Sequence, residues 1–494
     1  QRGRVGRFRA DHGHGGDKTG DKKQSDRLHA HFLPPMNLPS QYPRLGTASP
    51  MACPLFVQKP AHPATMSRLT RTFSDLVASL GAMAKGGPPP APLEVPANMD
   101  LFHSPRASRT LDRLRHAIRI DVETGTSEDA ARAVHFDMAL ALTRQEDWGR
   151  LTDLIRLHDT RRSVTPGGRA ATGLILEATH HDLLAGAAGS GDTEDLRRGL
   201  AAYEEMALEA PEDGIRALIA AEAAMALARR IARRDQRRRL GGQDGTWVRK
   251  AHDRAADLLA RSPMPDAPSP ADLLARARLA LGSADLGGST TDHLHKAIGL
   301  APGYVEALTL LGRALLPGQN GDLARLPATA KRAMDQSARY WGRGGYAWVF
   351  MEVLVEEPAT LAILDADLFL LGINDILDRH PHQYLANLWT SYLGVAMAPR
   401  TGWSALPPAA ESVRARLHDH AGPLMRRHLR KLHPSLWHQS RGSERTPYAP
   451  NREQEAVRGA DQAFWVIGRQ FEKELAKGCT IVVSDRGWQL QRGA

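Results

Sequence analysis

The stretch LHKAIGLAPGYVEALTLLGRAL, residues 294–315, contains the clearest fold signal in the chain. Apolar residues recur every three or four positions on both sides of Pro302, which places one apolar stripe on each of two helices. Pro302 ends the first helix, and its fixed φ helps to begin the next turn. Ala297 and Gly312 are small, so they let neighbouring helices approach closely. The stretch therefore predicts two short helices that pack as a hairpin.

Weaker copies of this helix, proline, helix unit occur before and after it. They are Tyr203, Met206, Leu208, Pro211 and Leu218; residues 255–259 before Pro263; and Phe369, Ile373, Ile376, Pro381, Ala386, Leu393 and Gly394. The pattern resembles the tetratricopeptide repeat, although the prolines are irregularly spaced rather than about 34 residues apart. The resemblance implies an irregular solenoid with a concave surface that binds peptides or partner proteins. It implies no catalytic residues.

Helical periodicity dominates from about residue 101 to residue 398, so the predicted fold class is all-α. Each predicted helix carries an apolar stripe too narrow to form a core alone, and stacked helix pairs would bury these stripes. Only residues 479–483 favour a short strand or an extended tail. The other predicted helices are 129–143, 148–159, 171–184, 196–210, 215–239, 247–261 and 271–281. Residues 342–345 are rich in Gly and indicate a helix break.

The chain divides into four predicted segments. Residues 1–65 combine Gly, Pro, His and charge, and we expect a disordered basic tail, either native or upstream of a true start at Met66. Residues 66–97 predict a short amphipathic helix and a Pro-rich linker, residues 98–400 a helical-repeat domain, and residues 401–494 a helical C-terminal region with an extended tail. The amphipathic helix could dock on the body or anchor the chain to a membrane surface or partner.

Composition excludes several classes of protein. With two cysteines, Cys53 and Cys479, a disulfide framework and a cysteine-rich zinc site are both excluded. The apolar stretches 347–355 and 361–373 are interrupted by acidic residues, so neither provides the roughly 20 apolar residues of a membrane-spanning helix. The N-terminus lacks the apolar core of a secretory signal peptide. We therefore expect a cytoplasmic protein.

The net charge of +10 is concentrated outside the helical body. Residues 1–65 hold ten Lys or Arg and four Asp or Glu, a balance of +6, which leaves only +4 for the rest. Arg outnumbers Lys by 54 to 11, as in proteins of GC-rich bacterial genomes. A clustered basic surface, rather than a high isoelectric point, is what indicates nucleic-acid binding. The overall charge therefore does not favour a nucleic-acid partner.

One basic patch is nevertheless prominent. On a continuous helix, two parallel rows of arginines would share one face, followed by Gly241 and Gly242 as a helix end. The rows consist of Arg229, Arg233 and Arg237 beside Arg230, Arg234 and Arg238, with Arg239 after them. This face could be a solvated helix end, a docking site for an acidic partner, or a contact for nucleic-acid phosphates.

Aromatic residues gather between 340 and 392, beside a stretch of seven acids between 351 and 378 that contains no Lys or Arg. The aromatic cluster could be core packing between helix pairs or a peptide-binding groove with large anchors. We expect the groove, and a partner with basic charge steered by the acids. The leading candidates for this surface are Trp341, Trp348, Glu356, Asp367 and Trp389.

No catalytic or metal motif is recognisable. HExxH, Walker A, GxSxG and GxGxxG are absent from the sequence. Asp365 and Asp367, two residues apart, point to different sides of a helix. His428, His433 and His438 are spaced by five residues, which does not align them on one helix face. We therefore expect no metal ligand set and no cofactor.

The predicted helical-repeat architecture is therefore the main feature from which we predict a function. We expect a non-enzymatic scaffold or adaptor that binds a partner protein or peptide. The alternatives are a helical-repeat enzyme or regulatory subunit with an unidentified site, and nucleic-acid binding through the helix at 229–239. No feature of the sequence indicates a small-molecule substrate.

Overall fold

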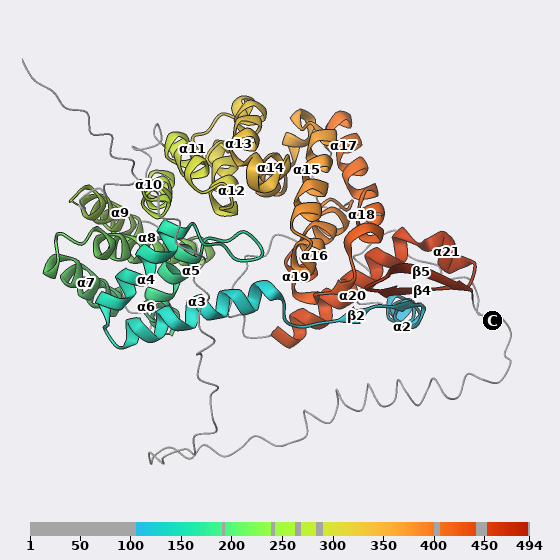
Figure 1. Ribbon diagram of the computed structural model, residues 1–494, viewed down its shortest axis with the longest axis horizontal. Coiled ribbons are helices and arrows are strands. Elements are labelled where there is room, and N and C mark those ends of the chain that lie inside the picture. The colour runs from blue at the N-terminus through green and yellow to red at the C-terminus, as the bar shows by residue number, and fades with distance from the viewer. Residues whose placement is uncertain are drawn as a thin grey trace, which may run out of the picture. The chain divides into compact units, whose positions relative to one another are not determined.

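A computed structural model describes residues 105–189, 193–238, 243–261, 268–282, 290–399, 406–440 and 452–492. These residues are mostly helical, as the periodicity predicts (Figure 1). The first helices are α2 (Pro105–Ala117), α3 (Ser127–Arg144), α4 (Trp148–Arg161), α5 (Ala171–Thr179), α6 (His181–Gly189), α7 (Thr193–Glu209), α8 (Gly214–Arg238), α9 (Gln243–Arg261) and α10 (Pro270–Gly282). The single helix predicted at 171–184 is wrong, because α5 and α6 meet at His180. The predicted tail and amphipathic helix lie outside the described residues.

The hairpin predicted around Pro302 is present as α11 (Thr290–Leu300) and α12 (Val305–Arg313). Its apolar stripes are buried, including Leu294, Leu308 and Leu311. Gly312 packs so closely against α14 (Gly344–Glu356) that a Cβ atom there would collide with the carbonyl oxygen of Val349. In the weaker copy on α7, however, Leu208 is 58% exposed, so it does not belong to a buried stripe.

Replacing Gly312 with Ala should lower the free energy of unfolding by about 1–3 kcal/mol, because the methyl group has no space beside α14. Gly299 is the matched control, since it lies in α11 and a Cβ atom there would have no neighbour within 4 Å. Gly299→Ala should be neutral or stabilising by up to about 1 kcal/mol, because Ala is the better helix former. Urea unfolding of both variants measures the difference, and equal effects would contradict the close approach of α12 and α14.

Some of the later helices pack against the next helix in the chain, and others pack against an element further away in the sequence. They are α13 (Leu326–Trp341), α14 (Gly344–Glu356), α15 (Ala366–Arg379), α16 (Gln383–Ser391), α17 (Pro408–Asp419), α18 (Ala421–His428), α19 (Pro434–Gln439), α20 (Arg452–Gln470) and α21 (Glu472–Ala476). Short 3₁₀ turns η3 (Pro317–Gln319), η4 (Leu323–Arg325) and η5 (Pro358–Ile363) connect some of them, and α16 continues into a π-helical turn, η6 (Tyr392–Ala396). The helix break predicted at 342–345 is confirmed: α13 ends at Gly342, whose φ is +61°.

Five short strands form two small sheets, and each sheet pairs a strand near the start of the described chain with a strand of the C-terminal region. The predicted strand at 479–483 is confirmed as β4 (Cys479–Ser484), which pairs with β5 (Gly487–Arg492) in antiparallel and β1 (Ile118–Arg119) in parallel orientation. A second parallel pair joins β2 (Asp121–Val122) to β3 (Lys431–Leu432). Helix α2 packs against α20 and β4. The segment before α3 is thus fixed to the C-terminal region, which sequence periodicity could not reveal.

Two hydrophobic clusters form the core between the described helices. One cluster lies among α3 to α10 and includes Ile155, Met225 and Leu259. The other runs from α2 and α10 to β4 and includes Trp389 and Trp465. The second cluster contains residues on both sides of residue 400, the predicted domain boundary. The hydrophobic core is therefore shared by the two predicted segments.

A short hairpin between α4 and α5 connects the first helices to the later ones. It closes with a bridge between Val164 and Ala170. Glu128 of α3 is buried and accepts hydrogen bonds from the Thr165 hydroxyl (2.8 Å) and the Gly167 amide (2.6 Å). The Gly168 carbonyl accepts from the amide of Val305 on α12 (3.0 Å). These contacts fix the hairpin between α3 and α12.

Within the described ranges, every helix is too short or too polar to cross a membrane.

Candidate functional site

The predicted aromatic groove is wrong, because its three tryptophans are core residues. The exposed fractions of Trp341, Trp348 and Trp389 are 0%, 2% and 0%. Their rings contact one another, with centroids 5.6 Å apart for Trp341 and Trp348 and 4.9 Å apart for Trp348 and Trp389. They lie on α13, α14 and α16, whose apolar faces pack together. In a chain with few aromatics, the cluster therefore marks the centre of the core.

Several acids of residues 351–378 form ion pairs with arginines that lie elsewhere in the chain. Glu356 lies 3.5 Å from Arg313 of α12, and Asp367 forms an ion pair with Arg416 of α17. Asp365 caps α15 by accepting a hydrogen bond from the amide of Leu368 (3.0 Å). Two further acids of α15 have arginine partners: Asp375 pairs with Arg343 and Asp378 with Arg427. Among the described residues, five of the seven acids of this stretch therefore lie within ion-pair distance of an arginine.

The predicted basic patch is described only in part. Helix α8 continues to Arg238, as the arginine pattern predicts, and Arg229 and Arg230 are exposed. Arg229 also lies near Glu306, where its charge helps to lower the pKa of the carboxyl group. The side chains of Arg233, Arg234, Arg237 and Arg238 lie outside the described residues, so the predicted arginine rows stay a prediction.

Sequence reasoning missed a charged cluster that joins three helices. Arg278 of α10 forms an ion pair with Glu222 of α8 and another with Glu306 of α12, the latter at 2.6 Å. Burial raises the pKa of Glu306, but attraction by Arg278 and Arg169 outweighs it and lowers the pKa below its usual value. The three residues lie 56 and 28 positions apart in the chain, and no local motif connects them. We interpret this cluster as structural, because Arg278 pairs with both carboxylates within the chain.

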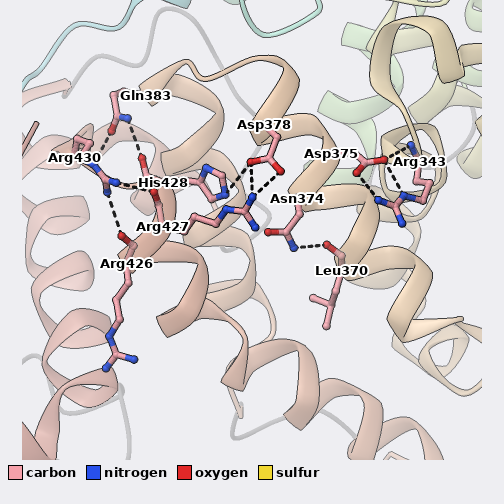
Figure 2. A network of polar contacts seen from close by, with 10 residues as sticks. All are labelled: Arg343, Leu370, Asn374, Asp375, Asp378, Gln383, Arg426, Arg427, His428 and Arg430. Carbon is pink, nitrogen blue, oxygen red and sulfur yellow. Dashed lines mark hydrogen bonds and ion pairs between the residues drawn. The ribbon is translucent and has the colours of Figure 1, made fainter. Parts of the chain in front are cut away.

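A second missed feature is a pocket of about 240 Å³ where α15, α16 and α18 come together. We call it the α16 pocket, and Figure 2 draws four of its lining residues, Gln383, Arg427, His428 and Arg430, as sticks. Its walls combine apolar groups with two arginines, two histidines and an amide. The lining residues are Leu377, Pro381, His382, Gln383, Ala386, Arg427, His428 and Arg430.

Gln383 positions the segment that carries Arg430. Its side-chain oxygen accepts hydrogen bonds from the amides of Arg430 (2.8 Å) and Lys431 (3.0 Å), and its side-chain nitrogen donates to the carbonyl of His428 (3.0 Å). The guanidinium of Arg430 donates to the carbonyls of Arg426, Leu429 and Arg427 at the end of α18. A cation is favourable there because the C-terminal end of a helix carries partial negative charge. Among the described residues, the guanidinium of Arg430 is thus held by backbone carbonyl groups.

Asp378 of α15 lies beside two of the residues that line the α16 pocket. Its two carboxylate oxygens accept hydrogen bonds from Arg427 at 3.0 and 2.8 Å, and the Nε2 atom of His428 lies 3.8 Å away (Figure 2). Burial lowers the pKa of His428 to about 4, even though Asp378 acts in the opposite direction. His428 is therefore neutral at neutral pH. Its Nε2 atom is buried and has no hydrogen-bond partner among the described residues.

Lowering the pH from 7 to 5 should destabilise the protein through His428 and the buried His180. Burial lowers the pKa of His180 to about 3. Below pH 6.5 the unfolded chain binds protons at these positions that the folded chain does not, so stability falls as the pH falls. Each histidine contributes up to about 1.4 kcal/mol per pH unit between pH 6.5 and its folded pKa. His180→Gln and His428→Gln should each flatten the pH dependence of urea unfolding, and an unchanged slope would contradict this.

The N-terminal turn of α16 adds to the positive character of the pocket. The helix begins after His382, whose side chain makes no capping hydrogen bond. Backbone amides at a helix N-terminus and the helix dipole both favour a negative group. Together with Arg427 and Arg430, this arrangement can bind an anion.

Comparison with known proteins adds no relative. No model of a known protein family matches the chain, and neither the curated proteins nor the solved structures contain a significant match.

Proposed function

We propose that the protein is a non-enzymatic, tetratricopeptide-like scaffold that binds another protein, with the α16 pocket as a main contact. The consecutive packed helix pairs, with α11 and α12 as the clearest unit, support a solenoid arrangement. Repeats of this kind hold an extended surface rigid, so that a partner can be recognised at several points.

The chemistry of the α16 pocket is the observation that carries this proposal. Its eight lining residues include donors that hold a ligand, but no hydroxyl, thiol, amine or carboxylate. A nucleophile and its activating base must lie within hydrogen-bond reach of each other, and the lining offers only the histidines as bases. The pocket is therefore suited to recognition rather than to covalent chemistry.

The charge of the proposed partner differs from the sequence-based expectation. A basic partner was expected because no Lys or Arg lies among the acids of residues 351–378. Arginines elsewhere in the described chain pair with five of those seven acids, among them Arg313 and Arg416. The α16 pocket presents arginine donors instead. We therefore propose a protein partner that is recognised by these arginine donors rather than by the acidic stretch.

Site-specific photo-crosslinking tests the proposed function. A benzophenone amino acid replaces His382, which is exposed at the rim of the pocket, and in a second variant it replaces the exposed Asp257 on α9. In the native host, we expect a discrete protein adduct from position 382 that does not form from position 257. No adduct from position 382, or the same adducts from both positions, would contradict a partner-binding role for this face.

A further inference from the structure

We infer that the α16 pocket binds a single carboxylate, the side chain of an Asp or Glu on an acidic partner protein. This inference rests on the proposed function and names the chemistry that the partner must present. It is carried by the juxtaposition of Arg427 and Arg430 in one pocket with a neutral histidine and the first turn of α16.

The balance of charges around the pocket favours one negative charge. Arg427 is already neutralised by Asp378, with which it makes two hydrogen bonds. The hydrogen bonds of Arg430 go to carbonyl groups only, so its positive charge has no carboxylate partner among the described residues. His428 is uncharged at neutral pH because burial lowers its pKa. The pocket therefore carries a net charge of about +1, which one carboxylate would neutralise.

Arg430 keeps donors available for such a carboxylate. A guanidinium has five N–H donors. The bonds of Arg430 to the carbonyls at the end of α18 use its two terminal nitrogens, and its Nε–H makes no hydrogen bond to a described residue. Because those bonds already fix the side chain, little further conformational entropy is lost when a ligand binds. The fork of donors matches the two oxygens of a carboxylate.

The walls of the pocket strengthen this interaction. Leu377, Pro381 and Ala386 supply an apolar lining beside the donors. Partial exclusion of water lowers the effective dielectric constant, and a charge-assisted hydrogen bond is then stronger than on an open surface. A doubly charged phosphate would leave excess negative charge beside Asp378. The geometry thus favours a carboxylate over a phosphate.

A positional-scanning peptide library tests the inference. The library contains peptides with one fixed residue, drawn from the twenty amino acids and phosphoserine, in otherwise randomised sequence. We expect peptides with Asp or Glu fixed to bind the full chain about tenfold more tightly than those with Asn or Gln, as a charge-assisted hydrogen bond predicts. Arg430→Gln should abolish this preference, and Arg430→Lys should retain part of it.

Arg426→Gln is the matched control, since Arg426 lies on α18 but does not line the pocket, and its side chain pairs with Glu474. This variant should keep the preference for Asp and Glu. Stronger binding of phosphoserine peptides than of Glu peptides would overturn the carboxylate in favour of a phosphate. Equal binding of Glu and Gln peptides, with the crosslinked adduct at position 382 intact, would overturn the inference and leave the proposed scaffold function standing. Equal binding of Glu and Gln peptides together with loss of the adduct at position 382 would overturn both the inference and the proposed function.

Discussion

Replacing Arg278 with Ala is expected to lower the free energy of unfolding by about 3–5 kcal/mol. Arg278 joins Glu222 of α8 and Glu306 of α12, and the side chains of Arg278 and Glu222 are only 14% and 4% exposed. Without the guanidinium, the buried carboxylate of Glu222 loses its ion-pair partner, and the less buried Glu306 loses one as well. Breaking a buried ion pair from one side costs more than the intact pair contributes, because a buried charge is left without a partner.

Urea unfolding followed by far-UV circular dichroism measures this loss. Arg249 of α9 is the matched control: it is exposed, and Arg249→Ala should change the free energy of unfolding by less than about 0.5 kcal/mol. Combining Arg278→Met with Glu222→Gln and Glu306→Gln should recover much of the stability, because no buried charge then remains. A loss from Arg278→Ala no larger than that of the control would contradict the buried cluster.

The helices could be predicted from the sequence because their signals are local. Apolar spacing and Pro302 locate α11 and α12, and the Gly-rich residues at 342–345 locate the break between α13 and α14. Each of these signals depends on residues within one or two helical turns. The boundary between α5 and α6 was missed because an apolar stripe continues through His180, where the helix nevertheless ends.

The candidate site could not be predicted because its residues are brought together by tertiary packing. Gln383 and Arg430 are 47 residues apart, and Asp378 and Arg427 are 49 apart. No motif spans these distances. The acidic stretch was misinterpreted for the same reason, since its arginine partners lie on helices that periodicity does not place beside it. The sequence could not show whether the aromatic cluster is a binding groove or a packed core, because both are rich in aromatic residues.

Replacing Trp348 with Ala is expected to lower the free energy of unfolding by about 3–5 kcal/mol. The indole of Trp348 is packed between Trp341 and Trp389, so its removal leaves a cavity where three helices meet. Trp348→Phe should cost less for two reasons. Most of the aromatic volume stays, and the lost indole N–H has no hydrogen-bond partner among the described residues. Guanidinium unfolding of the two variants gives both values, and a loss below about 1 kcal/mol for Trp348→Ala would show that the indole is not core.

A second substitution separates the core from the surface of the same helix. Glu356 on α14 lies near Arg313, and the side chains are 48% and 41% exposed. An exposed ion pair contributes about 0–1 kcal/mol, so Glu356→Lys should change stability little. The double variant Trp348→Ala with Glu356→Lys should therefore lose about as much stability as Trp348→Ala alone. If instead Glu356→Lys caused most of the loss, α14 would be held mainly by its charges rather than by the packing of Trp348.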